Sequence, residues 1–168
     1  MTETLSPAIP DSIERAAHDV LEAACDKDLT LAVAESCTGG LLASLLTDVE
    51  GVSHAFERGF VVYSKAAKCE LLNIAPEQID RCGAVSAAVA KAMADGALAA
   101  SGADIALAVT GFAGPGGPED EPGLVYLGCA RSGAETVTRE EHYGDIGRGP
   151  TRIRAIGTAL EMLRQAIG

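Results

Sequence analysis

The chain has 168 residues, of which 48% are hydrophobic, and its formal net charge is −11 at pH 7. This length and apolar content fit one compact domain over residues 1–168, without a linker or an internal repeat. Nucleic-acid-binding surfaces gather Lys and Arg against phosphates, so the acidic balance argues against a nucleic-acid partner. Aromatic residues make up 4% of the chain and Trp is absent, so aliphatic side chains with close backbone approach must build the core.

The five cysteines are widely separated, odd in number and form no Cys-x-x-Cys pair. That pattern fits neither a zinc framework nor a disulfide scaffold, and it favours a reducing compartment. Residues 1–10 include Glu3 and lack the basic start and apolar run of a secretory signal peptide. No apolar run approaches the roughly 20 residues that cross a bilayer. We therefore expect a cytoplasmic protein that is not bound to a membrane.

Hydrophobic periodicity predicts helices alternating with strands. In chain order the expected elements are a helix over 11–26, a strand over 31–34, a helix over 40–47, a strand over 60–63, a helix over 64–72, a short helix opening at 75–77, a helix from 87 to about 100, strands over 104–110, 124–130 and 135–142, and a helix over 151–167. Asp11 or Ser12 is the expected cap of the first helix, and Ser86 that of the long central one. Pro76 is expected at a first helical position.

This alternation predicts an α/β fold, a single three-layer α/β/α domain. The adjacent strands 124–130 and 135–142 make the sheet mixed, and the second of them should be the more exposed. Residues 111–123 form a long loop dense in Gly, Pro and acids, and long loops in compact domains are often functional. Alanine-rich helix faces are compatible with a homo-oligomer.

The segment Ala34-Glu35-Ser36-Cys37-Thr38-Gly39-Gly40 follows an apolar strand and precedes a leucine-rich helix. A strand, tight turn and helix place hydroxyls and free N–H groups at a helix N-terminus, which favours anions. Ser36 and Cys37 are two adjacent candidate nucleophiles, and a helix N-terminus would lower the pKa of the thiol. Spacing alone does not choose between these two nucleophiles. The turn is interpreted as a catalytic site, a phosphate-binding site, or both.

A serine nucleophile needs a base. His18 and His142 are interpreted as structural or surface residues, and His54 stays open as a base because it lies just before a strand. A desolvated lysine can serve instead, and Lys68 shares one helix face with Ser64. An ordinary solvated lysine explains that spacing at least as well.

Two further segments lie where strands end or helices begin, the usual place for ligands in α/β sheets. The loop from Gly111 matches no Walker pattern, so spacing leaves phosphate binding and a plain connection both open. Gly144-Asp145 and the arginines 148, 152 and 154 precede or open the last helix. Tyr63, between the predicted strand that it ends and the helix over 64–72, is a candidate for proton relay or for donation to an oxyanion.

Four motifs in order resemble one known family: the segment 34–40, Phe-Glu-Arg-Gly-Phe-Val-Val-Tyr-Ser at 56–64 with Lys68, Gly-Ala-Val-Ser at 83–86, and Thr-Gly-Phe-Ala-Gly-Pro at 110–115. They are similar to the CinA C-terminal domain family, which includes nicotinamide-nucleotide amidohydrolase, also called NMN deamidase. The resemblance covers nearly the whole chain, in the stand-alone form without the N-terminal domain of longer members. It implies hydrolysis of the carboxamide of nicotinamide mononucleotide, a pyridine mononucleotide, to the acid and ammonia, without metal or cofactor.

Carried onto this sequence, the resemblance makes Ser36 the nucleophile, Lys68 its base and Tyr63 an assisting proton donor. The residues that it implies for substrate binding are Cys37, Thr38, Gly39, Gly40, Ser64, Thr110, Gly111, Ala113, Gly114, Arg148 and Arg152. The backbone N–H of Cys37 or of a neighbour would hold the oxyanion. The arginines would meet the phosphate.

The chain departs from the family pattern at two places. The loop after Pro115 is short and acidic, and Ile146 stands where an arginine is expected after Asp145. Arg148, through a small insertion, or Arg152 would then take over the phosphate contact. Two other readings stay open: a non-catalytic nucleotide-binding or competence-associated interaction module, and cysteine chemistry at Cys37.

Overall fold

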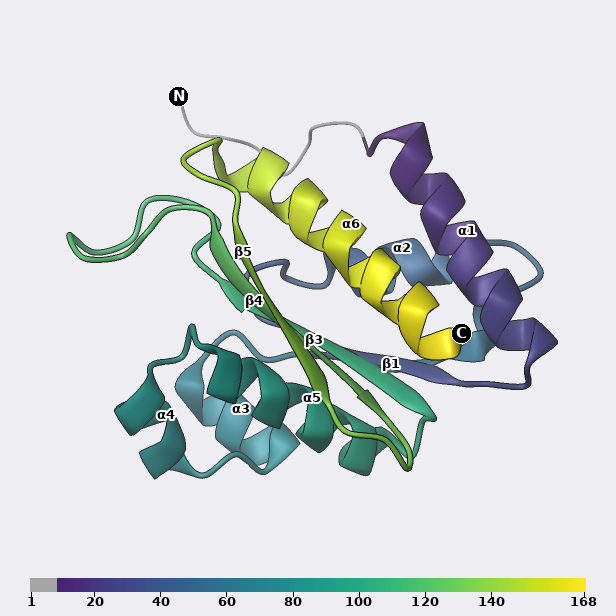
Figure 1. Ribbon diagram of the computed structural model, residues 1–168, viewed down its shortest axis with the longest axis horizontal. Helices are drawn as coiled ribbons and strands as arrows, with labels where there is room; N and C mark the ends of the chain where they lie inside the picture. Colours follow the sequence, from purple (N-terminus) through teal and green to yellow (C-terminus); the bar gives the residue numbers. More distant parts are fainter. Residues whose placement is uncertain (1–8) are drawn as a thin grey trace.

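The computed structural model describes residues 9–168, and Figure 1 shows a twisted sheet with helices on both sides. In chain order the elements are α1 (Asp11–Asp26), β1 (Leu31–Glu35), α2 (Leu41–Thr47), the 3₁₀ helix η1 (Ser53–Ala55), β2 (Phe56–Val61), α3 (Lys65–Leu72), α4 (Pro76–Cys82), α5 (Ala87–Ser101), β3 (Ile105–Gly111), β4 (Leu124–Arg131), β5 (Val137–His142) and α6 (Arg148–Ile167). The predicted three-layer α/β/α architecture is confirmed.

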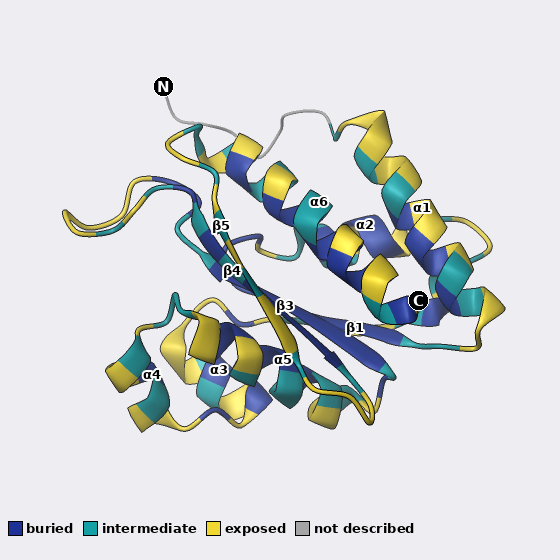
Figure 2. Ribbon diagram, viewed as in Figure 1, coloured by how far each residue is buried: buried dark blue, intermediate teal, exposed yellow. Residues whose placement is uncertain are grey.

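The sheet is mixed, as predicted, with strand order β2-β1-β3-β4-β5. β1 pairs in parallel with β2 and with β3, whereas β4 and β5 are antiparallel to their neighbours. β3 is buried along nearly its whole length, and β5 alternates between exposed and half-buried residues, as its sequence suggested. Figure 2 shows the same contrast between dark inner strands and the lighter β5.

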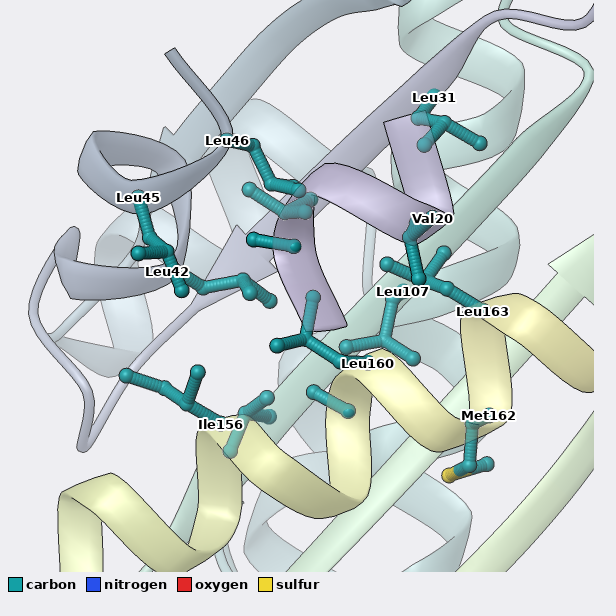
Figure 3. Packing of buried hydrophobic residues seen from close by; sticks show 14 of the residues in the cluster. Val20, Leu31, Leu42, Leu45, Leu46, Leu107, Ile156, Leu160, Met162 and Leu163 are labelled. Atoms are coloured by element: carbon teal, nitrogen blue, oxygen red, sulfur yellow. The ribbon is translucent and has the colours of Figure 1, made fainter. Parts of the chain in front are cut away.

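One face of the sheet packs large aliphatic side chains against α1, α2 and α6, and we call it the large-residue face. Figure 3 shows Ile156 and Leu160 of α6 facing Leu107 of β3 and the leucines of α2. All of these side chains are at most 5% exposed. Each fully buried leucine or isoleucine contributes about 1.5–3 kcal/mol of transfer free energy, so this layer supplies much of the stability.

The opposite face, which we call the small-residue face, is covered by α3, α4 and α5. Its sheet positions are mostly alanines, namely Ala32, Ala34, Ala106, Ala108 and Ala130. A Cβ added to Gly128 would stand 2.5 Å from the carbonyl oxygen of Ala90, and one on Gly96 of α5 would stand 2.2 Å from that of Leu72. The helices therefore approach the sheet and one another closely, as the scarcity of aromatic residues suggested.

Several predicted boundaries need correction. β2 begins at Phe56 and ends at Val61, so Tyr63 lies beyond the strand, and η1 was not predicted. The polar sequence at 56–59 hid the strand because β2 is an edge strand with exposed residues. α1 is preceded by Pro10 and has no side-chain cap, so Asp11 and Ser12 were wrong as caps. α6 begins at Arg148, three residues earlier than expected, which places this arginine in its first turn.

Two predictions for the starts of helices are confirmed. Ser86 caps α5 by accepting a hydrogen bond from the N–H of Val89, and Pro76 opens α4. Within residues 9–168, no helix combines the length and apolar character that a membrane span requires.

The path of the chain fixes where a site can form. After β1 the connection through α2 crosses the large-residue face, and after β2 the connection through α3, α4 and α5 crosses the small-residue face. The adjacent carboxyl ends of β1 and β2 are therefore the place from which the chain departs to opposite faces. In open α/β sheets, ligands bind at this kind of switch point.

Candidate active site

The turn between β1 and α2 is shaped by the last residue of the strand. Glu35 is fully buried, and its carboxylate lies against the start of α2. It accepts hydrogen bonds from the N–H groups of Ala43 at 2.8 Å, Leu42 at 3.1 Å and Gly40 at 3.2 Å. The expectation of an open anion site at this helix start was wrong, because an internal carboxylate already holds the donors.

Ser36 and Lys68 meet at the carboxyl ends of β1 and β2. The Nζ of Lys68 lies 3.0 Å from the Oγ of Ser36, and both side chains are largely buried. Burial lowers the pKa of the Lys68 ammonium, because desolvation disfavours its charged form. Lys68 is 2% exposed, so its interpretation as an ordinary solvated helix lysine was wrong.

Two backbone carbonyls orient the Lys68 amine. Its Nζ donates to the carbonyl oxygen of Val62 at 2.8 Å and to that of Tyr63 at 3.3 Å. A neutral amine has two N–H bonds and one lone pair. In the structure Nζ also donates to Ser36 Oγ. Once Lys68 is neutral, N–H bonds kept on the two carbonyls leave its lone pair for the Ser36 hydroxyl, which is the arrangement that proton abstraction requires.

Cys37 lies on the other face of the turn. Its thiol is 4% exposed and packs in the cluster of the large-residue face. Burial raises its pKa to about 12, and the nearby Arg152 offsets only part of that effect. The helix N-terminus was expected to lower this pKa, and that expectation was wrong because desolvation dominates. The thiol is protonated at neutral pH, which argues against cysteine chemistry here.

Tyr63 and Ser64 occupy the junction between β2 and α3. Tyr63 is 69% exposed and contacts Lys68 through its backbone carbonyl, so proton donation by its hydroxyl stays a prediction. Ser64 is the N-cap of α3, and its Oγ accepts a hydrogen bond from the N–H of Ala67 at 3.1 Å. Ser64 thus fixes the helix that carries Lys68, and its role toward substrate stays a prediction.

The arginines at the start of α6 reach two of the predicted segments. The Nε of Arg152 donates to the carbonyl oxygen of Cys37 at 2.8 Å, and its guanidinium lies beside Gly39. Arg148 lies over Gly114, where an added Cβ would stand 3.2 Å from its Nη2. The structure therefore brings the opening turn, the Gly-rich loop and the α6 start to one place.

Thr110 and Ala113 flank the end of β3 and are buried. The Thr110 hydroxyl donates to the carbonyl oxygen of Ala84 at 2.8 Å, which ties the Gly-Ala-Val-Ser segment to the strand end. Gly111 pairs with Val125 at the last β3–β4 register position. These contacts give Thr110 a structural function, and its predicted contact with substrate stays a prediction.

Gly39 and Gly40 shape the turn through their backbone, with φ values of +63° and +95°. Other residue types adopt such angles only with strain. Thr38 is 1% exposed, and its hydroxyl has no hydrogen-bond partner in the described part of the chain. The same holds for the hydroxyl of Thr151 in the first turn of α6.

The histidines lie elsewhere. His54 contacts the thiol of Cys25, and His142 lies between the carboxylates of Glu121 and Glu140, which raise its pKa. His18 belongs to an exposed group on α1, with Asp19 and Glu22, whose side chains could together hold a metal ion. No histidine of residues 9–168 makes a hydrogen bond with Ser36.

Sequence reasoning missed the function of Glu35 and of the Val62 carbonyl. Glu35 was quoted only as part of the opening motif. Its apolar neighbours gave one available signal, since an acid that ends a buried strand just before a helix start can bind the helix N–H groups. The Val62 carbonyl left no signal, because backbone groups carry no residue identity.

Comparisons with known proteins agree with the fold and with the motifs. A family model described as the CinA C-terminal domain matches residues 13–167. A CinA-like protein of Syntrophotalea carbinolica is 45% identical over 157 residues, which cover 92% of this chain and 38% of that relative. A CinA-like protein of Akkermansia muciniphila is 54% identical over 114 residues, which cover 67% of this chain and 28% of that relative. The chain thus spans well under half the length of these curated relatives.

Solved structures of similar length also match. The competence/damage inducible protein CihA from Agrobacterium tumefaciens has a TM-score of 0.92 and 42% identity, with 97% of this chain and 100% of that one covered. A CinA superfamily protein from Escherichia coli has a TM-score of 0.86 and 32% identity, with 97% of this chain and 95% of that one covered.

Proposed function

The chain belongs to the CinA C-terminal domain family, and from that premise we propose that it is a metal-independent amidohydrolase acting on nicotinamide mononucleotide. The observation that carries the proposal is the 3.0 Å contact between the buried Ser36 hydroxyl and the Lys68 amine. A serine beside a desolvated lysine is an activated nucleophile, and hydrolysis of an amide through an acyl-enzyme is chemistry that such a pair performs.

In the first half of the proposed reaction, Ser36 Oγ attacks the carboxamide carbon while Lys68 Nζ takes its proton. The positive pyridinium ring makes this carbon more electrophilic, which assists a modest nucleophile. The oxyanion meets backbone N–H groups of the turn. Within residues 9–168, no backbone carbonyl accepts a hydrogen bond from the N–H of Cys37 or Thr38, so these two are the candidate donors.

Collapse of the tetrahedral intermediate breaks the C–N bond. The Lys68 ammonium returns its proton to the departing nitrogen, either directly or by reprotonating Tyr63 after the Tyr63 hydroxyl has donated, and ammonia leaves with Lys68 neutral again. Water then attacks the ester carbon and gives a proton to Lys68. The C–O bond to Ser36 breaks, the serine recovers its proton, and nicotinic acid mononucleotide is released.

The phosphate end of the substrate is assigned to the arginines at the α6 start. Arg152 donates its Nε–H to the Cys37 carbonyl, and the planar guanidinium that carries its other N–H groups is suited to phosphate oxygens. Arg148 lies over the Gly-rich loop at Gly114. These positions support the proposal that the nucleotide lies between the opening turn and the loop after β3.

The test is incubation of the purified chain with nicotinamide mononucleotide, followed by assay of ammonia and of the acid product. Turnover that persists in EDTA and disappears in Ser36→Ala supports the proposal. A folded protein that gains thermal stability with the nucleotide but forms no product would instead identify the chain as a binding module. Loss of turnover in Cys37→Ala with full activity in Ser36→Ala would assign the chemistry to the thiol.

A further inference from the structure

Glu35 stands directly before the candidate nucleophile but faces the opposite side of the sheet. Successive residues of a strand alternate between faces, and Glu35 follows Leu31 and Val33 onto the large-residue face. There its carboxylate is fully buried and accepts three backbone hydrogen bonds from Gly40, Leu42 and Ala43. Neither oxygen makes a hydrogen bond with Ser36 or Lys68, so Glu35 takes no direct part in proton transfer.

Burial of a carboxylate is costly unless hydrogen bonds satisfy it. The two Glu35 oxygens are satisfied only while the chain turns back within five residues and delivers the α2 start to them. N-cap Gly40 supplies no side-chain cap to α2, so the Glu35 carboxylate replaces that cap from outside the helix. The Glu35 carboxylate thus fixes both ends of the segment 36–40.

Other contacts hold the same segment at its middle. The Ser36 N–H donates to the carbonyl oxygen of Val109 at 3.0 Å, and the Gly39 N–H donates to that of Ser36 at 3.2 Å. The Cys37 carbonyl accepts from Arg152. Within the segment 36–40, the N–H groups of Cys37 and Thr38 donate to no backbone carbonyl of residues 9–168, and the N–H of Gly40 donates to Glu35.

We propose that Glu35 is a positioning residue: its buried carboxylate holds the turn so that the Ser36 hydroxyl faces Lys68 and the N–H groups of Cys37 and Thr38 face the reacting carbonyl. The expected effect of Glu35 on catalysis rests on the proposed function. Its expected effect on the turn rests on the three hydrogen bonds alone. Loss of the carboxylate frees the turn while the base and its carbonyl partners on the small-residue face remain in place.

The experiment compares Glu35→Gln with Glu70→Gln, an exposed carboxylate on α3 that changes the net charge equally. Amide hydrogen exchange is measured at Gly40, Leu42 and Ala43, with the β3 amides as internal reference. Steady-state kinetics with nicotinamide mononucleotide give kcat and KM separately, and thermal melts report folding. Glu35→Asp, which keeps the charge but is one methylene shorter, is the second variant.

For Glu35→Gln we expect exchange at the three α2 amides to rise about tenfold, since hydrogen bonds to a carboxylate are about twice as strong as neutral ones. We expect kcat to fall about 10–100-fold with KM nearly unchanged, because small misplacements of reacting groups carry costs of that order. The pH profile should keep its shape, since Lys68 is untouched. Glu70→Gln should change none of these, and Glu35→Asp should recover part of kcat.

Unchanged exchange at the three amides in a folded Glu35→Gln variant would overturn the inference, as would an unchanged kcat. A rise in KM alone would also overturn it. If Glu35→Gln does not fold, the same two readouts in Glu35→Asp decide. Absence of turnover in the unmodified chain would contradict the proposed function, whereas the exchange result would still test the contacts of Glu35.

Discussion

The two faces of the sheet divide the candidate site between them. From the large-residue face come groups that hold the opening turn: the Glu35 carboxylate, the packed Cys37 side chain and the Arg152 guanidinium. From the small-residue face comes the Lys68 amine, beside the Ser36 hydroxyl. Adjacent residues of one turn thus have different chemistry because they face layers of different composition.

The difference in composition between the two faces explains how Lys68 can act as a base in this fold. Alanines and glycines let α5 approach the sheet and α3 approach α5, and Lys68 is buried in this closely packed layer. The large leucines and isoleucines of the other face bury Cys37 equally well, but burial raises the pKa of a thiol and lowers that of an amine. Burial therefore keeps the Cys37 thiol protonated, and it favours the neutral Lys68 amine that can take the proton of Ser36.

The largest expected effect separates Ser36 from Cys37. Ser36→Ala should lower kcat on the order of 10³-fold or more, because it removes the atom that forms the acyl-enzyme. Cys37→Ala should keep kcat within a few-fold and lower the melting temperature by creating a cavity. Ammonia release from both variants is the measurement, and equal losses in the two would contradict the division between faces.

The next effect concerns Lys68 and pH. Lys68→Met should lower kcat about 10²–10⁴-fold, the usual contribution of a general base. Burial lowers the Lys68 pKa, and the amine must be neutral to act, so activity should rise with pH through that pKa and be lost below it. Rates measured across pH test this, with exposed Lys65→Met as control. A flat profile would exclude Lys68 as the base.

A smaller effect tests the close packing of the small-residue face. Gly96→Ala should lower the free energy of unfolding by about 1–3 kcal/mol, because its Cβ would stand 2.2 Å from the backbone oxygen of Leu72. Gly157→Ala on α6 meets only the flexible end of Ile13 at 3.2 Å, so its change should stay within about 1 kcal/mol. Urea denaturation of both variants measures the contrast, and a cost at Gly157 as large as that at Gly96 would contradict it.

The smallest effect concerns a buried hydroxyl on the large-residue face. Thr151 is 1% exposed and its hydroxyl has no partner within residues 9–168, so Thr151→Val should be neutral or stabilise by up to about 1 kcal/mol. Thr158 on the same helix bonds Tyr143 at 2.7 Å, and Thr158→Val should destabilise by about 1 kcal/mol. Thermal melts that rank the two variants in the reverse order would show that the Thr151 hydroxyl is satisfied in solution.

Much of the fold could be predicted because hydrophobic spacing is a local signal. The buried run that became β3 and the amphipathic pattern of α6 depend on near neighbours in sequence. The start of β2 could not be predicted in this way, since Phe56-Glu57-Arg58-Gly59 pairs with β1 only in the folded chain. Edge strands carry polar residues, and their sequence pattern is weak.

The site was predictable as a set of segments but not as a geometry. Spacing gave Lys68 a helix face and could not say that this side chain is buried against Ser36 and the Val62 carbonyl. It placed Cys37 at a helix start and could not show that Glu35 already occupies the helix donors. The opposite effects of burial on the thiol and the amine appear only once the layers are packed.

The central claim is that Ser36, activated by Lys68, forms the covalent intermediate. The most direct measurement is mass spectrometry of peptides from protein quenched in acid during turnover of nicotinamide mononucleotide. The account predicts an acyl group derived from nicotinic acid mononucleotide on the peptide that contains Ser36, located on that residue by fragmentation and absent from Ser36→Ala. An acyl group on Cys37, or turnover by Ser36→Ala at the unmodified rate, would contradict it.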